Sequence, residues 1–161
     1  MTNFHQLYEK YAADVYRFAY WLSGNAAEAE DITSETFIRA WTSRKTLKAE
    51  TLKGYLLTIA RNLYLKQLRK DARHIPLITD YTDGTPSPET ITADRWELTA
   101  ALQAIAQLPE VDRAALILRV HHELPYAEIG RVLNISTSAA KVKIHRARLK
   151  LATVRHSEEL T

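Results

Sequence analysis

The sequence contains no cysteine. Disulfide bonds and thiolate metal sites are therefore excluded, and so is redox sensing through thiols of the chain itself. Nowhere do eighteen apolar residues run together, and the start, MTNFHQLYEK, lacks the basic segment and apolar stretch of a secretory signal. These absences predict a cytoplasmic protein with no membrane insertion of its own.

Glycine and proline are scarce as well, with four and five residues in a chain of 161. Three of them fall within ITDYTDGTPSPET, residues 78–90, which has no helical spacing of apolar residues. Elsewhere apolar residues recur with the 3.6-residue period of an α-helix, and the alternation typical of strands is rare. The sequence therefore predicts an all-α protein.

The linker-like stretch divides the chain into two small helical domains. We expect the first domain at residues 1–74, a flexible acidic linker at 75–92, the second domain at 93–155 and a C-terminal tail at 156–161. Residues 1–74 carry 12 Lys and Arg against 8 Asp and Glu, residues 75–95 carry 1 against 4, and residues 96–161 carry 9 against 7. Two basic blocks on either side of an acidic connector favour a polyanionic partner.

Capping residues mark the ends of several predicted helices. The first, long amphipathic helix ends at Gly24, and Asn25 caps the next one. After the linker, Asp94 and Glu97 have the spacing of a capping box, and an apolar stripe that runs from Leu98 to Leu108 is expected in the core.

The last two predicted helices have the form of a helix-turn-helix, whose second helix enters a major groove. A short helix from Pro125 to Leu133 turns at Asn134, which tolerates left-handed backbone, and the final helix begins near Ser136. Steps of about 100° per residue give the final helix one packed side, formed by Ala140, Ile144, Ala147 and Leu151.

The other side of this final helix is basic. Lys donates to guanine edges, His donates or accepts, and the methyl groups of Val142 suit a thymine methyl. On spacing alone, an ordinary solvated amphipathic helix is the alternative. The predicted reading residues are Lys141, Val142, His145 and Arg146, with Lys143, Arg148 and Lys150 at the margins, where phosphates are within reach.

A second candidate surface follows the helix predicted from Lys53 to Arg73, where one side grades from aromatic to polar to basic. An aromatic ring stacks on an unpaired base, an amide binds base edges, and cations hold the backbone, which is the combination that single-stranded DNA requires. An ordinary exposed face is the alternative. The stripe consists of Tyr55, Thr58, Asn62, Lys66, Arg69 and Arg73.

A third patch is acidic. Asp31 and Glu35 lie one turn apart on the second predicted helix, with Ile38 exposed beside them, and like charges at this spacing repel each other. Such a patch could dock a basic protein helix, although surface acidity of no special function is the alternative.

Together and in this order, these patches resemble the bacterial σ70 family, specifically the compact extracytoplasmic-function (group IV) sigma factors. AEAEDITSETFIRAW is similar to the core-binding helix of region 2, and GYLLTIARNLYLKQLRK resembles its minus-ten helix. LPEVDRAALILRV, LPYAEIGRVLNIS and KVKIHRARLKL are similar to region 4. The resemblance covers nearly the whole chain.

The resemblance implies an RNA polymerase sigma factor, which is not an enzyme and needs no cofactor or metal ion. It implies that Asp31, Glu35 and Ile38 dock the β′ clamp helices of core polymerase, and that the β flap is a further contact. It also implies that Asn62 and the basic residues after it melt and capture the minus-ten element, while residues 44–53 form the loop that takes a flipped base.

In region 4, the resemblance assigns a backbone contact to Arg119 and reading of the minus-thirty-five element to the basic side of the last helix. The residues expected to bind this DNA are Arg119, Lys141, Val142, Lys143, His145, Arg146 and Arg148. An anti-sigma protein is the implied regulator.

This chain departs from the family pattern at several positions. Tyr55 stands where the family usually has Trp, and Lys66 replaces a usual Asp. Ser136 and Ser138 replace the common Pro and Gly at the turn and helix start. A different entry angle of the recognition helix is the expected consequence of the last two changes.

Two other functions compete with this interpretation. The first is a stand-alone helix-turn-helix regulator that does not bind core polymerase. The second is a metal-dependent nuclease that uses His121, His122 and Glu123, but adjacent residues on a helix point about 100° apart and cannot easily hold one ion.

Overall fold

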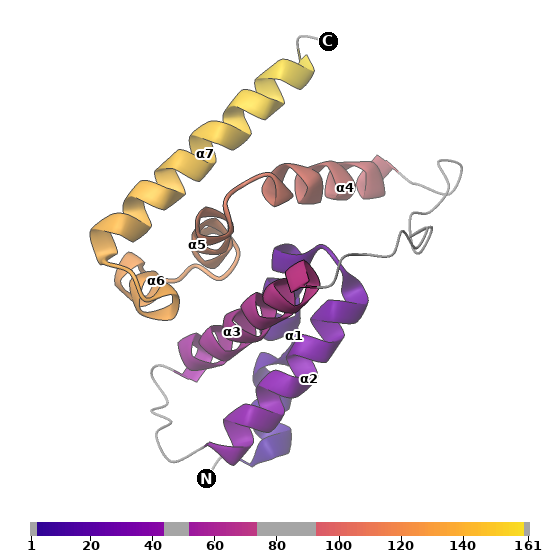
Figure 1. Cartoon of the computed structure of the whole chain (residues 1–161), viewed down its shortest axis with the longest axis vertical. Helices are drawn as coiled ribbons and strands as arrows, with labels where there is room; N and C mark the ends of the chain where they lie inside the picture. The colour runs from indigo at the N-terminus through magenta and orange to yellow at the C-terminus, as the bar shows by residue number, and fades with distance from the viewer. Residues whose placement is uncertain (1–2, 44–51, 74–92, 160–161) are drawn as a thin grey trace.

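The computed structural model describes residues 3–43, 52–73 and 93–159, and all regular secondary structure in these ranges is α-helical (Figure 1). The all-α prediction is confirmed. The predicted linker at 75–92 lies outside the described residues. The helices are α1 Phe4–Ser23, α2 Ala26–Thr42, α3 Leu52–Arg73, α4 Ala93–Ala106, α5 Glu110–Val120, α6 Tyr126–Leu133 and α7 Thr137–Glu159.

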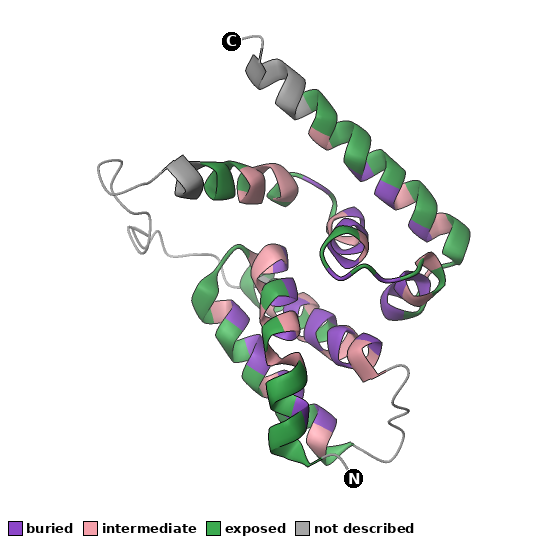
Figure 2. Ribbon diagram, turned by 180° about the vertical axis from the view of Figure 1, so that it is seen from behind, coloured by how far each residue is buried: buried purple, intermediate pink, exposed green. Residues whose placement is uncertain are grey.

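The first three helices lie side by side at the N-terminal end of the molecule, and α5, α6 and α7 form a second group (Figure 1). In Figure 2 the outer sides of α1, α2 and α7 are exposed while their inner sides are buried. Phe18, Leu56, Leu118, Ile129 and Ile144 are at most 1% exposed, and they belong to one apolar core that includes residues of both groups.

Local sequence signals set the connection between α1 and α2. Gly24 adopts the left-handed conformation (φ 69°, ψ 14°), and its amide donates to the Tyr20 carbonyl at 2.7 Å. The Asn25 side chain accepts from the amide of Glu28 at 2.9 Å. Because glycine takes a positive φ without steric cost and Asn satisfies a free helix amide, one helix ends and the next begins within three residues. Both cap predictions are confirmed.

The turn between α6 and α7 also has the predicted form. Asn134 is left-handed (φ 56°, ψ 48°), and the Ser136 hydroxyl accepts from the amide of Ala139 at 3.0 Å. Gly130 permits the close turn, because a Cβ there would lie 2.7 Å from the carbonyl oxygen of Ile135. The packed side of α7 is confirmed as well, since Ala140 and Ala147 are fully buried.

Two predictions for α4 are wrong. The helix begins at Ala93, so Asp94 lies inside its first turn and is not the N-cap residue. Leu98 is 39% exposed although we expected it in the core. Residues 97–100 are all exposed, and among the described side chains of α4 the half-buried ones begin at Ala101 (Figure 2). The stripe becomes buried at its other end, where Leu108 is 3% exposed.

Two arginines join the two helix groups. The Arg61 guanidinium on α3 donates to both carboxylate oxygens of Glu110 on α5, at 2.9 and 2.8 Å, and these side chains are 11% and 17% exposed. Arg113 on α5 donates to the Leu22 carbonyl at 2.8 Å and to the Tyr64 hydroxyl at 2.9 Å. Bidentate and charge-assisted hydrogen bonds of this kind are about twice as strong as neutral ones.

His122 also lies at the contact between the groups. It follows α5, its ring meets Phe18 of α1 edge to face at 5.6 Å, and its residue is 5% exposed. Neither ring nitrogen has a hydrogen-bond partner. Burial lowers the pKa of His122 to about 3, and the positive charges of Lys53, His121 and Arg17 contribute in the same direction. The neutral imidazole is therefore the form that fits this contact.

This pKa shift predicts a loss of stability in acid. Between about pH 6.5 and pH 3 the unfolded chain binds a proton at residue 122 that the folded chain does not, so the free energy of unfolding falls as the pH falls. From pH 7 to pH 4.5 we expect a loss of about 1 to 3 kcal/mol that the His122→Leu variant does not show. Urea unfolding of both proteins at the two pH values measures the difference. Equal pH dependence of the two proteins contradicts the prediction.

Candidate nucleic-acid interface and docking surface

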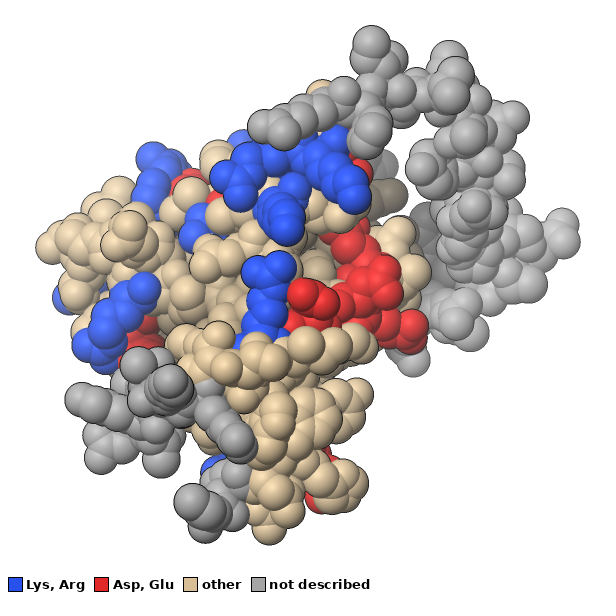
Figure 3. Space-filling view, turned by 60° about the horizontal axis from the view of Figure 1, so that its bottom comes forward, with Lys and Arg blue, Asp and Glu red and all other residues tan. Residues whose placement is uncertain are grey.

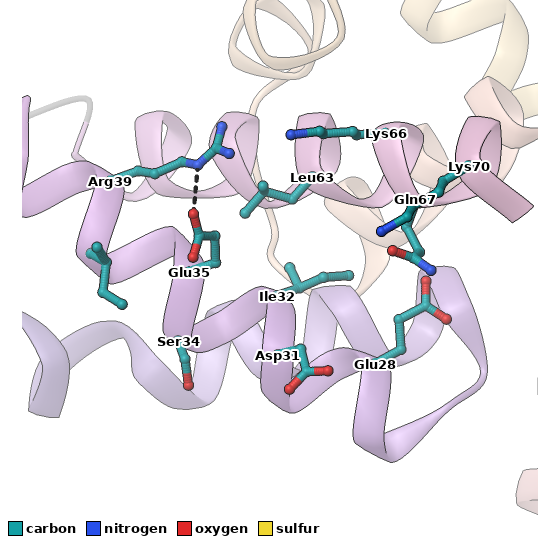
Figure 4. Close-up of a pocket in the computed structure, with 11 residues that line it drawn as sticks. Glu28, Asp31, Ile32, Ser34, Glu35, Arg39, Leu63, Lys66, Gln67 and Lys70 are labelled. Carbon is teal, nitrogen blue, oxygen red and sulfur yellow. Dashed lines mark hydrogen bonds and ion pairs between the residues drawn. The ribbon is translucent and has the colours of Figure 1, made fainter.

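The acidic patch lies on the outward side of α2. Asp31 is exposed, Ile38 is 54% exposed, and Glu35 accepts a hydrogen bond from Arg39 at 3.0 Å. All three residues line a groove of about 660 Å³ between α2 and α3 (Figure 4). The structure therefore brings together the residues that we predicted for polymerase docking, and it places them at the edge of a concave surface.

The opposite wall of this groove comes from α3 and includes Lys66 and Lys70 (Figure 4). Sequence reasoning placed Lys66 on the minus-ten stripe, and Lys70 is one of the basic residues after Asn62 to which the resemblance assigned the same DNA element. The separation of four residues could have placed both on one side of α3, but nothing in the sequence indicated that this side faces α2. At the end of the groove, burial raises the pKa of Glu28, and the nearby charges of Asp71 and Asp31 raise it further.

The predicted minus-ten stripe is exposed only in part. Asn62 and Arg69 are exposed, whereas Tyr55 is half-buried and packed against the core. The Thr58 hydroxyl donates to the carbonyl of Gly54 at 2.8 Å, within α3 itself. Arg73 ends the helix, and its side chain lies outside the described residues, as does most of the predicted base-capturing loop at 44–53. A ligand can therefore reach Asn62 and Arg69, whereas Tyr55 at the aromatic end of the stripe is partly covered.

Helix α6 packs against α3 near this aromatic end. A Cβ on Gly54 would meet the carboxylate of Glu128 on α6, so the Glu128 side chain occupies the space that a larger residue at position 54 would need. The first helix of the helix-turn-helix is thus in direct contact with the start of α3, next to Tyr55.

The basic side of α7 leaves all four predicted reading residues exposed, although the Arg146 side chain, which is 57% exposed, also binds Asp112. Lys141, Val142 and His145 are exposed, and Val142 is 60% exposed. These side chains project from the second helix of the helix-turn-helix, opposite the buried Ala140 and Ile144. An exposed mixture of cations, an imidazole and a branched apolar side chain suits base edges in a major groove.

Arg146 has an internal partner that the sequence did not reveal. Its Nε and Nη2 atoms donate to the two carboxylate oxygens of Asp112 on α5 at 2.8 and 2.9 Å, and the Asp112 side chain is 2% exposed. The hydrogen bonds and charge of Asp112 raise the pKa of Arg146. Lys143 lies 3.8 Å from the same carboxylate. Since 34 residues separate Asp112 from Arg146, no local pattern could have predicted this pair.

Two further basic residues that we predicted to bind DNA in region 4 lie next to the ring of Tyr126. The Arg119 guanidinium lies 4.4 Å from the ring centroid of Tyr126, and the Lys141 ammonium lies 5.5 Å from it. Arg119 also donates to the Leu124 carbonyl at 3.1 Å. Cation–π contacts of this kind hold the two side chains near the start of the recognition helix. Arg148 lines a different feature, an apolar cavity of about 320 Å³ that also touches Trp21 of α1.

The described residues do not support the metal-site alternative. No three metal-binding side chains come together within the described ranges. His122 is buried against Phe18, whereas His121 and Glu123 are exposed. In the same ranges, no helix is both long and apolar enough to cross a membrane.

Comparison with protein families matches two segments of the chain. The family model for sigma-70 region 2 matches residues 7–74, and the model for sigma-70 region 4 matches residues 98–151. The first segment contains α1 to α3, and the second contains most of α4 to α7. The two segments agree with the two helix groups of the structure.

Curated relatives match across most of the chain. The extracytoplasmic-function (ECF) RNA polymerase sigma factor SigE of Mycolicibacterium smegmatis is 37% identical over 99% of this chain, which spans 65% of that protein's length. The ECF sigma factor SigL of Mycobacterium tuberculosis is 34% identical over 88% of this chain and 82% of its own length. SigW of Bacillus subtilis is 32% identical over 90% and 84%.

Solved structures show the same fold. The sigma factor RpoE of Bartonella quintana, solved with the anti-sigma factor NepR, aligns with a TM-score of 0.74 at 23% identity and covers 95% of this chain and 96% of its own. CnrH, solved with the cytosolic domain of CnrY, also gives a TM-score of 0.74, at 20% identity and with 96% and 88% covered. With these two family segments and these relatives, the chain belongs to the σ70 family, among its extracytoplasmic-function RNA polymerase sigma factors.

Proposed function

We propose that this chain binds core RNA polymerase and directs it to promoters by reading two DNA elements at once. The observation that carries the proposal is the orientation of α7. Its Ala140 and Ile144 side is buried, and its Lys141, Val142 and His145 side is exposed at the second position of a helix-turn-helix. A sigma factor acts by binding and performs no bond chemistry, so the chain is not an enzyme.

We assign a different role to each of the two helix groups. Residues 1–74 form region 2, which docks on polymerase and captures the minus-ten element, and residues 93–155 form region 4, which reads the minus-thirty-five duplex. The segment that we expected as a tail at 156–161 begins within α7, which continues to Glu159. The β′ clamp helices would occupy the groove beside Asp31 and Glu35, and the β flap would contact region 4.

The minus-ten element would be held as a single strand on α3. Opening duplex DNA costs about 1.4 kcal/mol per base-pair step on average. Stacking of a captured base on an aromatic ring returns about 1 to 3 kcal/mol, so a few captured bases offset the opening of a few steps. In this proposal Tyr55 supplies the ring and Asn62 the amide, while Arg69 holds the backbone.

Reading both elements requires the two helix groups to separate. The elements are about 25 base pairs apart, which is about 85 Å along a duplex at about 3.4 Å per base pair. The 18 residues of 75–92 can span at most about 60 Å when fully extended, and the dimensions of the domains supply the rest. A state in which α6 lies against the start of α3 therefore cannot serve both elements.

We further propose a cytoplasmic location and control by an anti-sigma protein. The location is supported by the proposed work on core polymerase and DNA. Control by an anti-sigma protein is supported by the similarity to the sigma factor RpoE, which was solved in complex with the anti-sigma factor NepR. A stand-alone regulator that ignores polymerase is not favoured, because such a protein has no use for the groove beside Asp31.

Core binding and run-off transcription test the proposal directly. Purified chain mixed with core polymerase should direct transcription from a subset of genomic fragments. Asp31→Lys should weaken core binding by about tenfold, because it replaces a partner of a basic helix with a like charge. Fluorescence anisotropy of labelled protein measures the dissociation constant. A wild-type chain that neither binds core polymerase nor directs any transcript would refute the function.

Two alanine variants separate the proposed DNA roles. Lys141→Ala should weaken holoenzyme binding to a minus-thirty-five duplex about tenfold, since one specific base contact contributes about 1 to 3 kcal/mol. Asn62→Ala should leave duplex binding unchanged and slow open-complex formation, measured with a fluorescent base in the minus-ten element. The reverse pattern would show that the two domains had been assigned to the wrong elements.

The contact between helix groups can be tested with dyes, because the chain has no cysteine of its own. Ala27→Cys and Ala152→Cys place labels at exposed positions of α2 and α7. Glu110→Gln removes the charge that binds Arg61, a hydrogen-bonded charge interaction of about 1.5 to 3 kcal/mol, so energy transfer between the dyes should fall. Glu123→Gln at an exposed position is the matched control. Unchanged transfer in Glu110→Gln contradicts the role of this ion pair in holding the groups together.

A further inference from the structure

The groove between α2 and α3 has two edges of opposite charge. Glu28, Asp31 and Glu35 follow one another along the α2 edge, and Lys66 and Lys70 follow one another along the α3 edge. Figure 4 shows these side chains along the two helices, and the space-filling view shows Asp and Glu side chains gathered next to Lys and Arg side chains on one face (Figure 3).

The floor between these edges is apolar. Ile32 is 5% exposed, Leu63 is half-buried, and both line the groove (Figure 4). Ile38 adds an exposed apolar side chain at one end of the groove. An apolar floor between polar edges is the arrangement into which an amphipathic helix lays its apolar side.

The charges of the two edges do not neutralise each other across the groove. Within the described part of the chain, Asp31, Lys66 and Lys70 take part in no ion pair, and Glu35 pairs with Arg39 of its own helix. Opposite charges that face each other across an apolar floor without meeting can both be satisfied by a ligand that lies between them.

The balance of charge distinguishes between a nucleic-acid ligand and a protein ligand. Three acidic side chains (Glu28, Asp31, Glu35) and three basic ones (Arg39, Lys66, Lys70) line the groove. A DNA strand that follows Lys66 and Lys70 would pass along the acidic edge, where its phosphates are repelled. A polypeptide helix can carry both signs at once, so it fits this lining and a polyanion does not.

We propose that Lys66 and Lys70 bind core polymerase and not DNA. The inference rests on the proposed function and specifies the partner: a helix of the polymerase clamp that carries a basic residue opposite Asp31, an acidic residue opposite Lys66 and Lys70, and an apolar side chain over Leu63. The acidic residue of the partner sets the register of docking, because a purely basic helix would be repelled by the lysine edge.

The raised pKa of Glu28 is consistent with a partner that carries a basic residue. Burial and the neighbouring negative charges of Asp71 and Asp31 disfavour its ionised form, which raises its pKa. A basic residue of the partner at this end of the groove would relieve that repulsion. The acidic edge therefore gains from a cation while the lysine edge gains from an anion.

Charge reversal at matched positions of α3 tests the inference. Lys66→Glu should weaken binding to core polymerase, measured by fluorescence anisotropy without DNA, by about tenfold. Arg69→Glu is the matched control, because Arg69 is exposed one turn away on the same helix and does not line the groove. It should leave core binding within about twofold and slow open-complex formation, since it replaces a phosphate contact with a negative charge that repels the DNA backbone.

A photo-crosslinking amino acid at position 66 gives a second measurement that does not depend on weakened binding. In the polymerase complex on promoter DNA, residue 66 should crosslink to a polymerase subunit, and the same group at position 69 should crosslink to DNA. Crosslinking of position 66 to DNA, or core binding by Lys66→Glu equal to that of the wild type, overturns the inference.

These outcomes remain distinct from a failure of the proposed function. If Lys66→Glu binds core polymerase normally while Asp31→Lys does not, the docking site stands and the role of the lysine edge is refuted. If the wild-type chain does not bind core polymerase at all, the proposed function fails and the inference fails with it.

Discussion

The burial of one apolar side of each helix in a core shared by both helix groups determines where every charged surface points. Phe18 of α1, Leu118 of α5 and Ile144 of α7 are at most 1% exposed and belong to this core. Once these sides are buried, the acidic residues of α2 and the basic residues of α7 have only the outward directions left. The surfaces that we assign to polymerase and promoter are therefore consequences of packing, and a change in packing would turn them elsewhere.

The structure divides the basic residues of this chain into those that hold the fold and those that remain for a partner. Arg61 binds Glu110, Arg113 binds the Leu22 carbonyl and the Tyr64 hydroxyl, and Arg146 binds Asp112. Arg61 and Arg146 each bind both oxygens of one carboxylate, a geometry that matches the planar guanidinium group, whereas Arg113 binds a carbonyl and a hydroxyl oxygen. Net positive charge alone therefore overstates the surface that is available to DNA, and the exposed Lys141, His145 and Arg69 are better indicators of it.

Two kinds of contact join the two helix groups: an ion pair between α3 and α5, and the packing of α6 against the start of α3. Arg61 and Glu110 keep some exposure to water, which screens their attraction and also lowers the cost of desolvating the two charges. In the second contact, α6 reaches the start of α3 where Gly54 leaves room for Glu128. In the proposed function, this contact opens when the chain binds polymerase and both promoter elements.

The sequence by itself determined the helices, most of their ends and their buried sides. Gly24, Asn25 and Asn134 were predicted as caps and turns and are found in those roles, because each depends on hydrogen bonds to residues within a few positions. The Asp94 cap was wrong because the same local pattern is compatible with several starting positions of one helix. The buried side of α7 was right because the angular step between residues is a property of the helix alone.

Only the tertiary structure decided which charged residues meet. Arg61 and Glu110 are 49 residues apart and Arg146 and Asp112 are 34 apart, so their pairing depends on how helices approach one another in space. The same holds for the groove that sets Lys66 and Lys70 across from Asp31, which the sequence had placed on two unrelated surfaces. Helical periodicity states which side of a helix a residue occupies, but the neighbour on that side is set by the packing of the whole core.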